Sequence, residues 1–156
     1  MSDGSDATPM NVDMDLLITA RTSWDRSSTE FYLDTQTGDV VTVPVSVLKG
    51  ETPVPEGNPE MAEQVAAIQA GGERYLRIPP LPERAEQILM EKFAETVKDA
   101  ELSAKLHAAS ADPKGYRMFR RLLHGSVAER RRWQEFRAKH LGANAEKWLA
   151  SEGLRR

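Results

Sequence analysis

The chain of 156 residues contains no cysteine. This absence excludes disulfide bonds, thiolate zinc sites, iron–sulfur clusters and cysteine nucleophiles. The chain also has no apolar run near the roughly 18 to 20 residues that cross a bilayer, and its N-terminus has neither a basic segment nor an apolar signal segment. From these absences we expect a cytoplasmic protein with no membrane partner.

The usual sequence motifs of metal and phosphate chemistry are missing as well. His107, His124 and His140 are too far apart for the HxxxH or HExxH pairs that bind zinc. The chain has no glycine-rich phosphate loop, no G-x-S-x-G and no lysine-centred P-loop. No carboxylate stands in an apolar stretch that would shift its pKa. We therefore expect no cofactor, no metal and no catalytic residue, while an enzyme whose site is assembled from distant residues would leave no such motif.

The composition is typical of a globular protein, because 40% of the residues are hydrophobic and 29% are charged. Residues 1–11 are small, polar and acidic, so we predict a disordered acidic arm there. Residues 12–156 have the size of one domain. Within this domain we place a part that contains a β-hairpin at residues 13–80 and a helical part at residues 82–152.

The net charge of −3 hides a strong asymmetry along the chain. Residues 114–156 hold 12 Lys and Arg against 4 Asp and Glu, a net charge of +8, so residues 1–113 carry a net charge of −11. Such a split is typical of a basic face that binds a polyanion, and it is equally typical of two parts that dock on each other.

Alternating apolar and polar residues predict a β-hairpin over residues 31–45. Between its strands, Asp34 and Gly38 fit a type I turn followed by a glycine in the left-handed conformation. The two aspartates at this turn could attract a cation, but an Asx turn explains Asp34 without one. A similar alternation predicts a third, short strand near residues 75–78.

The remaining segments predict helices. Apolar residues recur at helical spacing from Asp13, where a strand is the alternative, and again after the Asn58-Pro59 pair, which is a typical helix start. From Pro82 onward the spacing is helical throughout, with Asp112 expected to open one helix and Gly142 to interrupt the last. The predicted fold class is α+β: a small antiparallel sheet made of the hairpin plus one short strand, with five to seven short helices and a helical C-terminal half.

Three stretches resemble the bacterial group known as uncharacterised protein family 0158: FYLDTQTGDV, RYLRIPPLPERAEQILMEKFAETVKDAELSAKL and MFRRLLHGSVAERRRWQEFRAKHLGANAEKWL. In this order they run from Phe31 to Leu149, and the ordered set is far more specific than the hairpin alone. The resemblance implies an α+β domain and no assigned activity, so it carries over no catalytic residue. It also implies a Gly-Ala-Phe-Arg-Arg-Phe-like run, in which Arg117 and Met118 here replace the small pair and Leu122 replaces the last aromatic.

Arginines cluster in the C-terminal segment and form the candidate phosphate- or anion-binding site: Arg117, Arg120, Arg121, Arg130, Arg131 and Arg132. The first three lie away from the aromatic stripe of their helix, whereas the last three spread over about 200° of theirs. Two interpretations remain open. In the first, the arginines form a polyanion surface. In the second, the aromatics form the core and the arginines are solvated or paired with acidic residues, within the domain or across a homodimer. These acidic residues lie on the two preceding helices: Glu83, Glu86, Glu91, Glu95, Asp99 and Glu101.

Together these features predict a non-enzymatic bacterial interaction or regulatory protein that binds another macromolecule, with a protein partner or a second copy expected first. The alternative is a nucleic-acid-binding protein that contacts phosphates through the C-terminal arginine-rich helices. An enzyme with a dispersed site ranks third. A further hypothesis is that the acidic arm, residues 1–11, lies near the basic helices and competes there with a polyanion.

Overall fold

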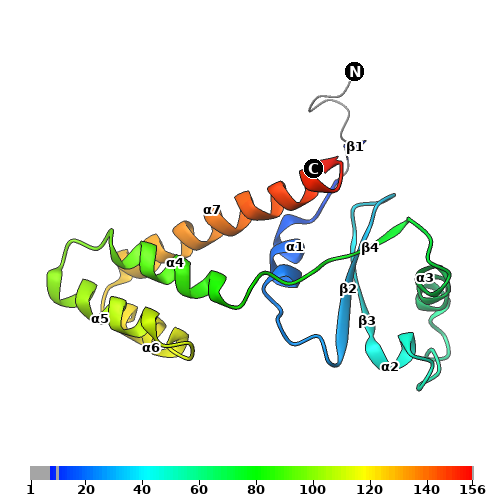
Figure 1. The fold of residues 1–156 in the computed structure, drawn as a ribbon, viewed down its shortest axis with the longest axis horizontal. Coiled ribbons are helices and arrows are strands. Elements are labelled where there is room, and N and C mark those ends of the chain that lie inside the picture. The colour runs from blue at the N-terminus through cyan, green and yellow to red at the C-terminus, as the bar shows by residue number, and fades with distance from the viewer. Residues whose placement is uncertain (1–7, 10, 156) are drawn as a thin grey trace. The chain divides into compact units, whose positions relative to one another are not determined.

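The computed structural model describes residues 8–9 and 11–155. These residues form seven helices, a three-stranded antiparallel sheet and a separate pair of two-residue strands (Figure 1). The predicted α+β class, with its small sheet and helical C-terminal half, is confirmed. The chain divides into two compact units. The first unit runs through Leu81 and resumes at Asn144, and the second unit spans Pro82–Ala143.

The sheet of the first unit has the strand order β3-β2-β4. Strand β2 (Thr29–Asp34) pairs antiparallel with β3 (Val40–Pro44) and with β4 (Tyr75–Arg77). In this register Leu33 lies opposite Val40 on one side and opposite Leu76 on the other. The predicted hairpin and the predicted third strand are both present.

The turn between β2 and β3 has the expected conformation. Gly38 has φ of 85°, and its amide donates to the Asp34 carbonyl at 2.7 Å. The Asp34 side chain accepts from the Gln36 amide at 2.9 Å, which is the predicted Asx turn. A side chain at position 38 would also meet the Asn11 carbonyl oxygen, 2.3 Å from an ideal Cβ. Glycine is therefore required at position 38 for both its backbone angle and its lack of a side chain.

The second strand is shorter than the alternation predicted, because β3 ends at Pro44 and a short helix, α2 (Val45–Leu48), follows at once. Proline has no amide to continue a strand ladder, and β3 is an edge strand, as proline requires. Val45 is therefore helical, which corrects the predicted strand end.

Two helices of the first unit begin at capping residues. Helix α1 (Met14–Arg21) begins after Asp13, whose carboxylate accepts from the Leu16 amide at 3.1 Å, so the helix and not the alternative strand forms here. Helix α3 (Pro59–Gln69) begins after Asn58, whose side-chain oxygen accepts from the Met61 amide at 3.1 Å. Both caps are those that the sequence predicted.

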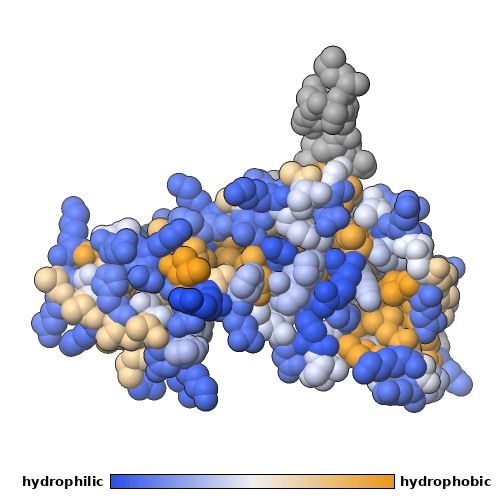
Figure 2. Space-filling view, in the orientation of Figure 1, coloured by the Kyte–Doolittle hydropathy of each residue, from blue (hydrophilic) through white to orange (hydrophobic). Residues whose placement is uncertain are grey.

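Each face of the sheet carries its own apolar cluster. On one face Leu33 packs with Leu17, Ile78 and Leu149, all nearly or fully buried. On the other face Val43 packs with a second cluster from α2 and α3 that includes Val47 and Val65. Apolar side chains of this second cluster are visible at the surface between α2, α3 and the sheet (Figure 2).

The second unit is built from four helices, of which the last continues into the first unit: α4 (Arg84–Ala94), α5 (Ala100–Ala111), α6 (Tyr116–Leu123) and α7 (Val127–Ser151). Its core is aromatic. Phe93, Phe119 and Trp133 are buried, and their ring centroids lie 4.9 to 6.3 Å apart in edge-to-face pairs. The prediction that the C-terminal aromatics belong to a core is confirmed for Phe119 and Trp133.

Two predicted helix boundaries are wrong. Asp112 ends α5 and does not open α6, which starts at Tyr116 after Gly115. Gly115 lies so close to the Ala109 carbonyl that a Cβ would sit 1.9 Å from its oxygen, so the two helices need a tight glycine turn between them. Similarly, α7 passes straight through Gly142.

The continuity of α7 has a packing reason. Leu141, Ala145 and Leu149 are buried and follow one another at intervals of four residues, so one apolar stripe continues past Gly142. A glycine inside a helix costs about 1 kcal/mol relative to alanine. The burial of this stripe outweighs that cost.

The predicted disordered arm, residues 1–11, falls largely outside the described residues, and so does the hypothesis that it lies near the basic helices. Within it, Thr8–Pro9 forms strand β1, which pairs in parallel with β5 (Leu154–Arg155). No sequence pattern predicted this pairing. Nor did any pattern predict that the residues from Asn144 onward return to the first unit.

Candidate functional site

Helix α6 presents a basic face, which we call the α6 face. It consists of Arg117, Arg120, Arg121 and His124, with Tyr116 at its edge, and these residues line a hollow of about 430 Å³. At about 100° per residue, the four basic positions span roughly 100° of the helix circumference. Phe119 lies on the opposite side of α6, in the aromatic core. The amphipathic spacing of α6 therefore places its arginines together on the outside.

The arginines of the α6 face are not neutralised by neighbouring carboxylates. None of the six ion pairs among the described residues includes Arg117, Arg120 or Arg121. Their closest specific contact is that of the Arg120 guanidinium, 5.8 Å from the centre of the Tyr116 ring. From residue 113 to residue 128 the sequence holds four Lys and Arg and no Asp or Glu. The local charge of the α6 face is therefore uncompensated.

The other three predicted arginines do not join this face. Arg132 donates to the Glu129 carboxylate at 2.6 Å and to the Thr96 hydroxyl at 2.8 Å, and its guanidinium lies 5.1 Å from the centre of the Phe93 ring. Arg130 is half-buried and Arg131 is exposed, and neither lines the hollow. The structure thus brings together three of the six predicted arginines and assigns Arg132 to contacts within its own unit.

Internal pairing with acidic helices, the second interpretation of the basic segment, holds at one position. Arg137 of α7 donates to Glu86 of α4 at 2.7 Å, and both side chains are largely buried. Of the other acidic residues proposed as partners, Glu101 pairs with Lys105 on its own helix. Sequence reasoning missed Arg137, because nothing local distinguishes it from the neighbouring arginines.

An exposed apolar side chain borders the α6 face. Met118 is 48% exposed, and its position on the helix is next to Arg121. Arginine, tyrosine and methionine are the residue types that protein–protein interfaces favour over the rest of a protein surface. The α6 face and its border contain all three.

A second concave feature, which we call the first-unit cleft, has a volume of about 760 Å³. It is lined by the start of α1, the turn between β2 and β3, helix α3 and strand β4. Its apolar lining comes from Leu16, Val40, Val41, Met61 and Ala67. Exposed carboxylates also line it, from Asp13, Asp39, Glu60 and Glu63. The cleft is thus partly apolar and strongly acidic.

One ion pair, between the buried Asp34 and the more exposed Arg74, stands in the wall of the first-unit cleft. Arg74 donates to both carboxylate oxygens of Asp34, at 3.0 and 2.9 Å, and its guanidinium lies 5.1 Å from the centre of the Tyr75 ring. Burial alone would raise the pKa of Asp34, but hydrogen bonds from Arg74, Gln36 and Thr37, with the charge of Arg74, lower it below its ordinary value. Burial raises the pKa of Tyr75.

The Asp34–Arg74 pair corrects the expectation that no carboxylate of this chain has a tuned pKa. The two residues are 40 positions apart, and they meet because Asp34 lies opposite Tyr75 in the pairing of β2 with β4. The neighbouring acids are different. No ion pair of the described residues includes Asp39, Glu60 or Glu63, and no group of three or more His, Asp or Glu side chains in the described part of the chain could hold a metal ion.

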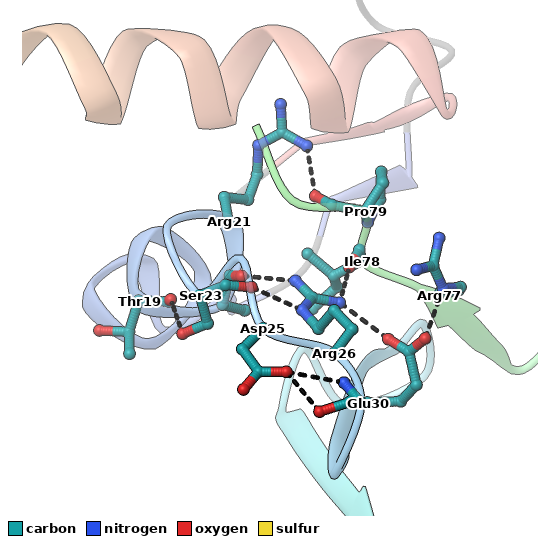
Figure 3. Close-up of polar contacts among 11 residues, drawn as sticks. Thr19, Arg21, Ser23, Asp25, Arg26, Glu30, Arg77, Ile78 and Pro79 are labelled. Carbon is teal, nitrogen blue, oxygen red and sulfur yellow. Dashed lines mark hydrogen bonds and ion pairs between the residues drawn. The ribbon is translucent and has the colours of Figure 1, made fainter. Parts of the chain in front are cut away.

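Two further arginines of the first unit have structural roles (Figure 3). Arg26 donates to the Ser23 and Ile78 carbonyls, each at 2.7 Å, and to the Glu30 carboxylate at 2.8 Å. Arg21 is also buried and donates to the Pro79 carbonyl at 3.0 Å. These side chains tie the segment after α1 to the segment after β4, and they donate to backbone oxygens and to side chains of the same unit.

One comparison with known proteins identifies a family, and none adds an activity. In the described part of the chain, no helix is both long and apolar enough to cross a membrane. Neither the curated proteins nor the solved structures contain a match to the chain. The family model described as Uncharacterised protein family (UPF0158) matches residues 7–155, which include both the α6 face and the first-unit cleft. The chain therefore belongs to the uncharacterised protein family UPF0158.

Proposed function

We propose that this chain is a non-enzymatic interaction protein that binds an acidic partner protein through the α6 face. The observation that carries the proposal is the convergence of Arg117, Arg120 and Arg121 on one hollow without a carboxylate partner. Arginine recognises carboxylates through two parallel hydrogen bonds, and its guanidinium is less strongly hydrated than an ammonium group. Three such side chains on one face suit a surface that contains Asp and Glu.

The border of the α6 face favours a protein over other anions. Met118 is about half exposed and Tyr116 is half-buried, so both still have apolar surface that a partner could cover. Covering apolar surface contributes about 25 cal/mol per Å². A protein partner offers both carboxylates and apolar side chains. A phosphate backbone offers only charge at such positions.

Binding is a better description of the α6 face than catalysis. Arginine remains protonated and only donates hydrogen bonds, so it serves as an anion anchor and not as a base or a nucleophile. His124 is the one residue of the face whose type commonly serves as a general base, and among the described residues no Ser, Asp or Glu lines the hollow with it. These features support anchoring of a partner.

Nucleic-acid binding is the second candidate, and one observation favours it. The arginines of α6 occupy about 100° of the helix, which is narrow enough for one row of phosphates. The formal charge of the second unit is +4, from 13 Lys and Arg against 9 Asp and Glu. Three phosphate contacts would make log K fall with log salt at a slope of about −3 on duplex DNA. A flat salt dependence would exclude this candidate.

The test is affinity capture from nuclease-treated lysate of the source cells, with the full-length chain as bait. The variant Arg117→Glu/Arg121→Glu reverses the α6 face, and Arg84→Glu/Lys139→Glu makes the same change of charge at exposed positions elsewhere in the second unit. We expect the wild type and the control to retain the same partner protein. The α6 variant should retain it at least about tenfold less, which corresponds to 1.4 kcal/mol. Equal recovery with the α6 variant would refute the proposal.

A further inference from the structure

We infer that the acidic partner of the α6 face is a second copy of this chain, and that the α6 face of one copy docks into the first-unit cleft of the other. The inference rests on the proposed function, to which it adds the identity of the partner and its docking site. Two unmatched surfaces of opposite charge on the same chain support it.

The charges of the two surfaces are opposite in sign and available for a contact. Asp13, Asp39, Glu60 and Glu63 line the first-unit cleft, are exposed and belong to none of the ion pairs of the described residues. The one arginine in the cleft, Arg74, already holds Asp34 with two hydrogen bonds. The cleft therefore offers exposed carboxylates outside these ion pairs to the three guanidinium groups of the α6 face.

The apolar surface of the two features is complementary as well. Four large apolar side chains of the described residues stand out as exposed, at 44% to 64% of their surface. Leu16, at 49%, lines the first-unit cleft, and Met118, at 48%, borders the α6 face. A contact between the two surfaces would cover both of these side chains at once. Charge alone would not explain why an exposed apolar residue accompanies each charged surface.

The same charges decide which kind of contact forms between two copies. A contact of α6 face with α6 face would place arginines against arginines, and a contact of cleft with cleft would place carboxylates against carboxylates. The formal charges of the two units, −7 for the first and +4 for the second, disfavour both arrangements. The favoured contact joins two different surfaces, so the copies associate head to tail, either as a closed assembly or as an open chain.

The test is sedimentation velocity on the full chain at about 50 mM and about 500 mM salt, because exposed ion pairs are screened as the salt concentration rises. One variant reverses the charge of the α6 face, Arg117→Glu/Arg121→Glu, and another cancels the net negative charge of the cleft lining, Asp39→Lys/Glu63→Lys. We expect the wild type to associate at low salt with a dissociation constant at least tenfold lower than at high salt. Each variant alone should be monomeric, because the first leaves two acidic surfaces and the second leaves a cleft that no longer attracts the α6 face.

An equimolar mixture of the two variants provides the decisive measurement. In the mixture, the native cleft of one variant meets the native α6 face of the other, so we expect the association to return. Such recovery also shows that both variants are folded. A monomeric wild type at low salt, or a mixture that stays monomeric, would overturn the inference.

The outcomes separate this inference from the proposed function. If the α6 variant is monomeric while the cleft variant still associates, a second copy binds the α6 face elsewhere, which overturns docking in the cleft and leaves the α6 face as a binding surface. If the wild type is monomeric but captures another protein in an α6-dependent manner, the second copy is the wrong partner and the proposed function stands. If the wild type associates but the α6 variant associates equally well, the inference is overturned, and the capture experiment decides the proposed function separately.

Discussion

Arg26 in the first unit and Arg117 in the second carry the same side chain in contrasting surroundings. The Arg26 side chain is only 8% exposed, and its donors are taken by backbone carbonyls and by Glu30. Arg117 is exposed and belongs to no ion pair among the described residues. The first unit uses arginine to hold segments of its chain together, and the second unit leaves arginine available at its surface. The contrast separates arginines that stabilise the fold from arginines that we propose for binding.

The contrast is graded, since two arginines fall between these extremes. Arg74 is partly exposed but forms an ion pair with the buried Asp34. Arg132 is also partly exposed, and it donates to Thr96 and forms an ion pair with Glu129. Substitutions along this series should lower the free energy of unfolding by decreasing amounts. If the losses of unfolding free energy do not decrease in this order, the contrast between the two kinds of arginine is wrong.

The largest effect is expected for Arg26→Met. Removing the guanidinium leaves the Ser23 and Ile78 carbonyls without this donor and takes one of two arginine partners from the Glu30 carboxylate, and breaking a buried pair in this way costs about 3–5 kcal/mol. Urea unfolding followed by circular dichroism measures the change. Arg77→Met is the matched control, because Arg77 binds the same Glu30 but its side chain is 51% exposed. The control should lose no more than about 1 kcal/mol, and equal losses would contradict the ranking.

The second largest effect is expected for Asp34→Asn, and it should depend on pH. At pH 7 the loss of the hydrogen bonds between charged groups should cost about 1.5–3 kcal/mol. The folded state lowers the pKa of Asp34, so its stabilisation is present above the ordinary aspartate value of about 3.9 and is lost as the pH falls below it. Unfolding curves of wild type and variant between pH 7 and about pH 2 should therefore converge at low pH. A constant difference would show that Asp34 is not the group that titrates.

A smaller effect is expected for Arg132→Ala. The side chain gives up a hydrogen bond to Thr96, an ion pair with Glu129 and its contact with the Phe93 ring, but it is partly exposed. Together these contacts should contribute about 1 kcal/mol. Chemical denaturation measures the loss. Arg131→Ala, one residue earlier and without such contacts, should leave the free energy of unfolding unchanged. Equal losses at the two positions would show that the loss comes from a change in helix propensity and not from the contacts of Arg132.

The smallest effect is expected for Arg117→Glu/Arg121→Glu. Both positions are exposed and unpaired, so the free energy of unfolding should change by no more than about 0.5 kcal/mol. The same variant is expected to lose its partner. Thermal unfolding alongside the binding measurement checks both at once. A loss of several kcal/mol would move these arginines into the group that stabilises the fold.

Local features of the fold could be predicted from the sequence. The caps at Asp13 and Asn58 and the left-handed glycine at position 38 depend only on residues a few positions away. The core role of Phe119 and Trp133 follows from helical spacing, which is also local. Each of these features depends on a short stretch of residues, so a single sequence is enough to predict it.

The features that the sequence did not predict join distant residues. Arg74 and Asp34 are 40 positions apart, and Arg132 and Thr96 are 36 apart. Without these contacts, six arginines of the basic segment formed one candidate site, although only three share the α6 face. The same limit explains the misplaced break at Gly142, because the stripe that keeps α7 continuous draws on packing partners far away in the chain.

The discontinuity of the first unit bears on the order in which the protein folds during synthesis. The core residues Leu17 and Leu33 emerge from the ribosome early, but Leu149, which packs in the same cluster, emerges only after the whole of Pro82–Ala143. At about 5–20 residues per second, the synthesis of Pro82–Ala143 alone takes roughly 3 to 12 seconds. The second unit is contiguous and can form its helices as they appear. The nascent first unit must keep an apolar face uncovered until the last residues of the chain arrive.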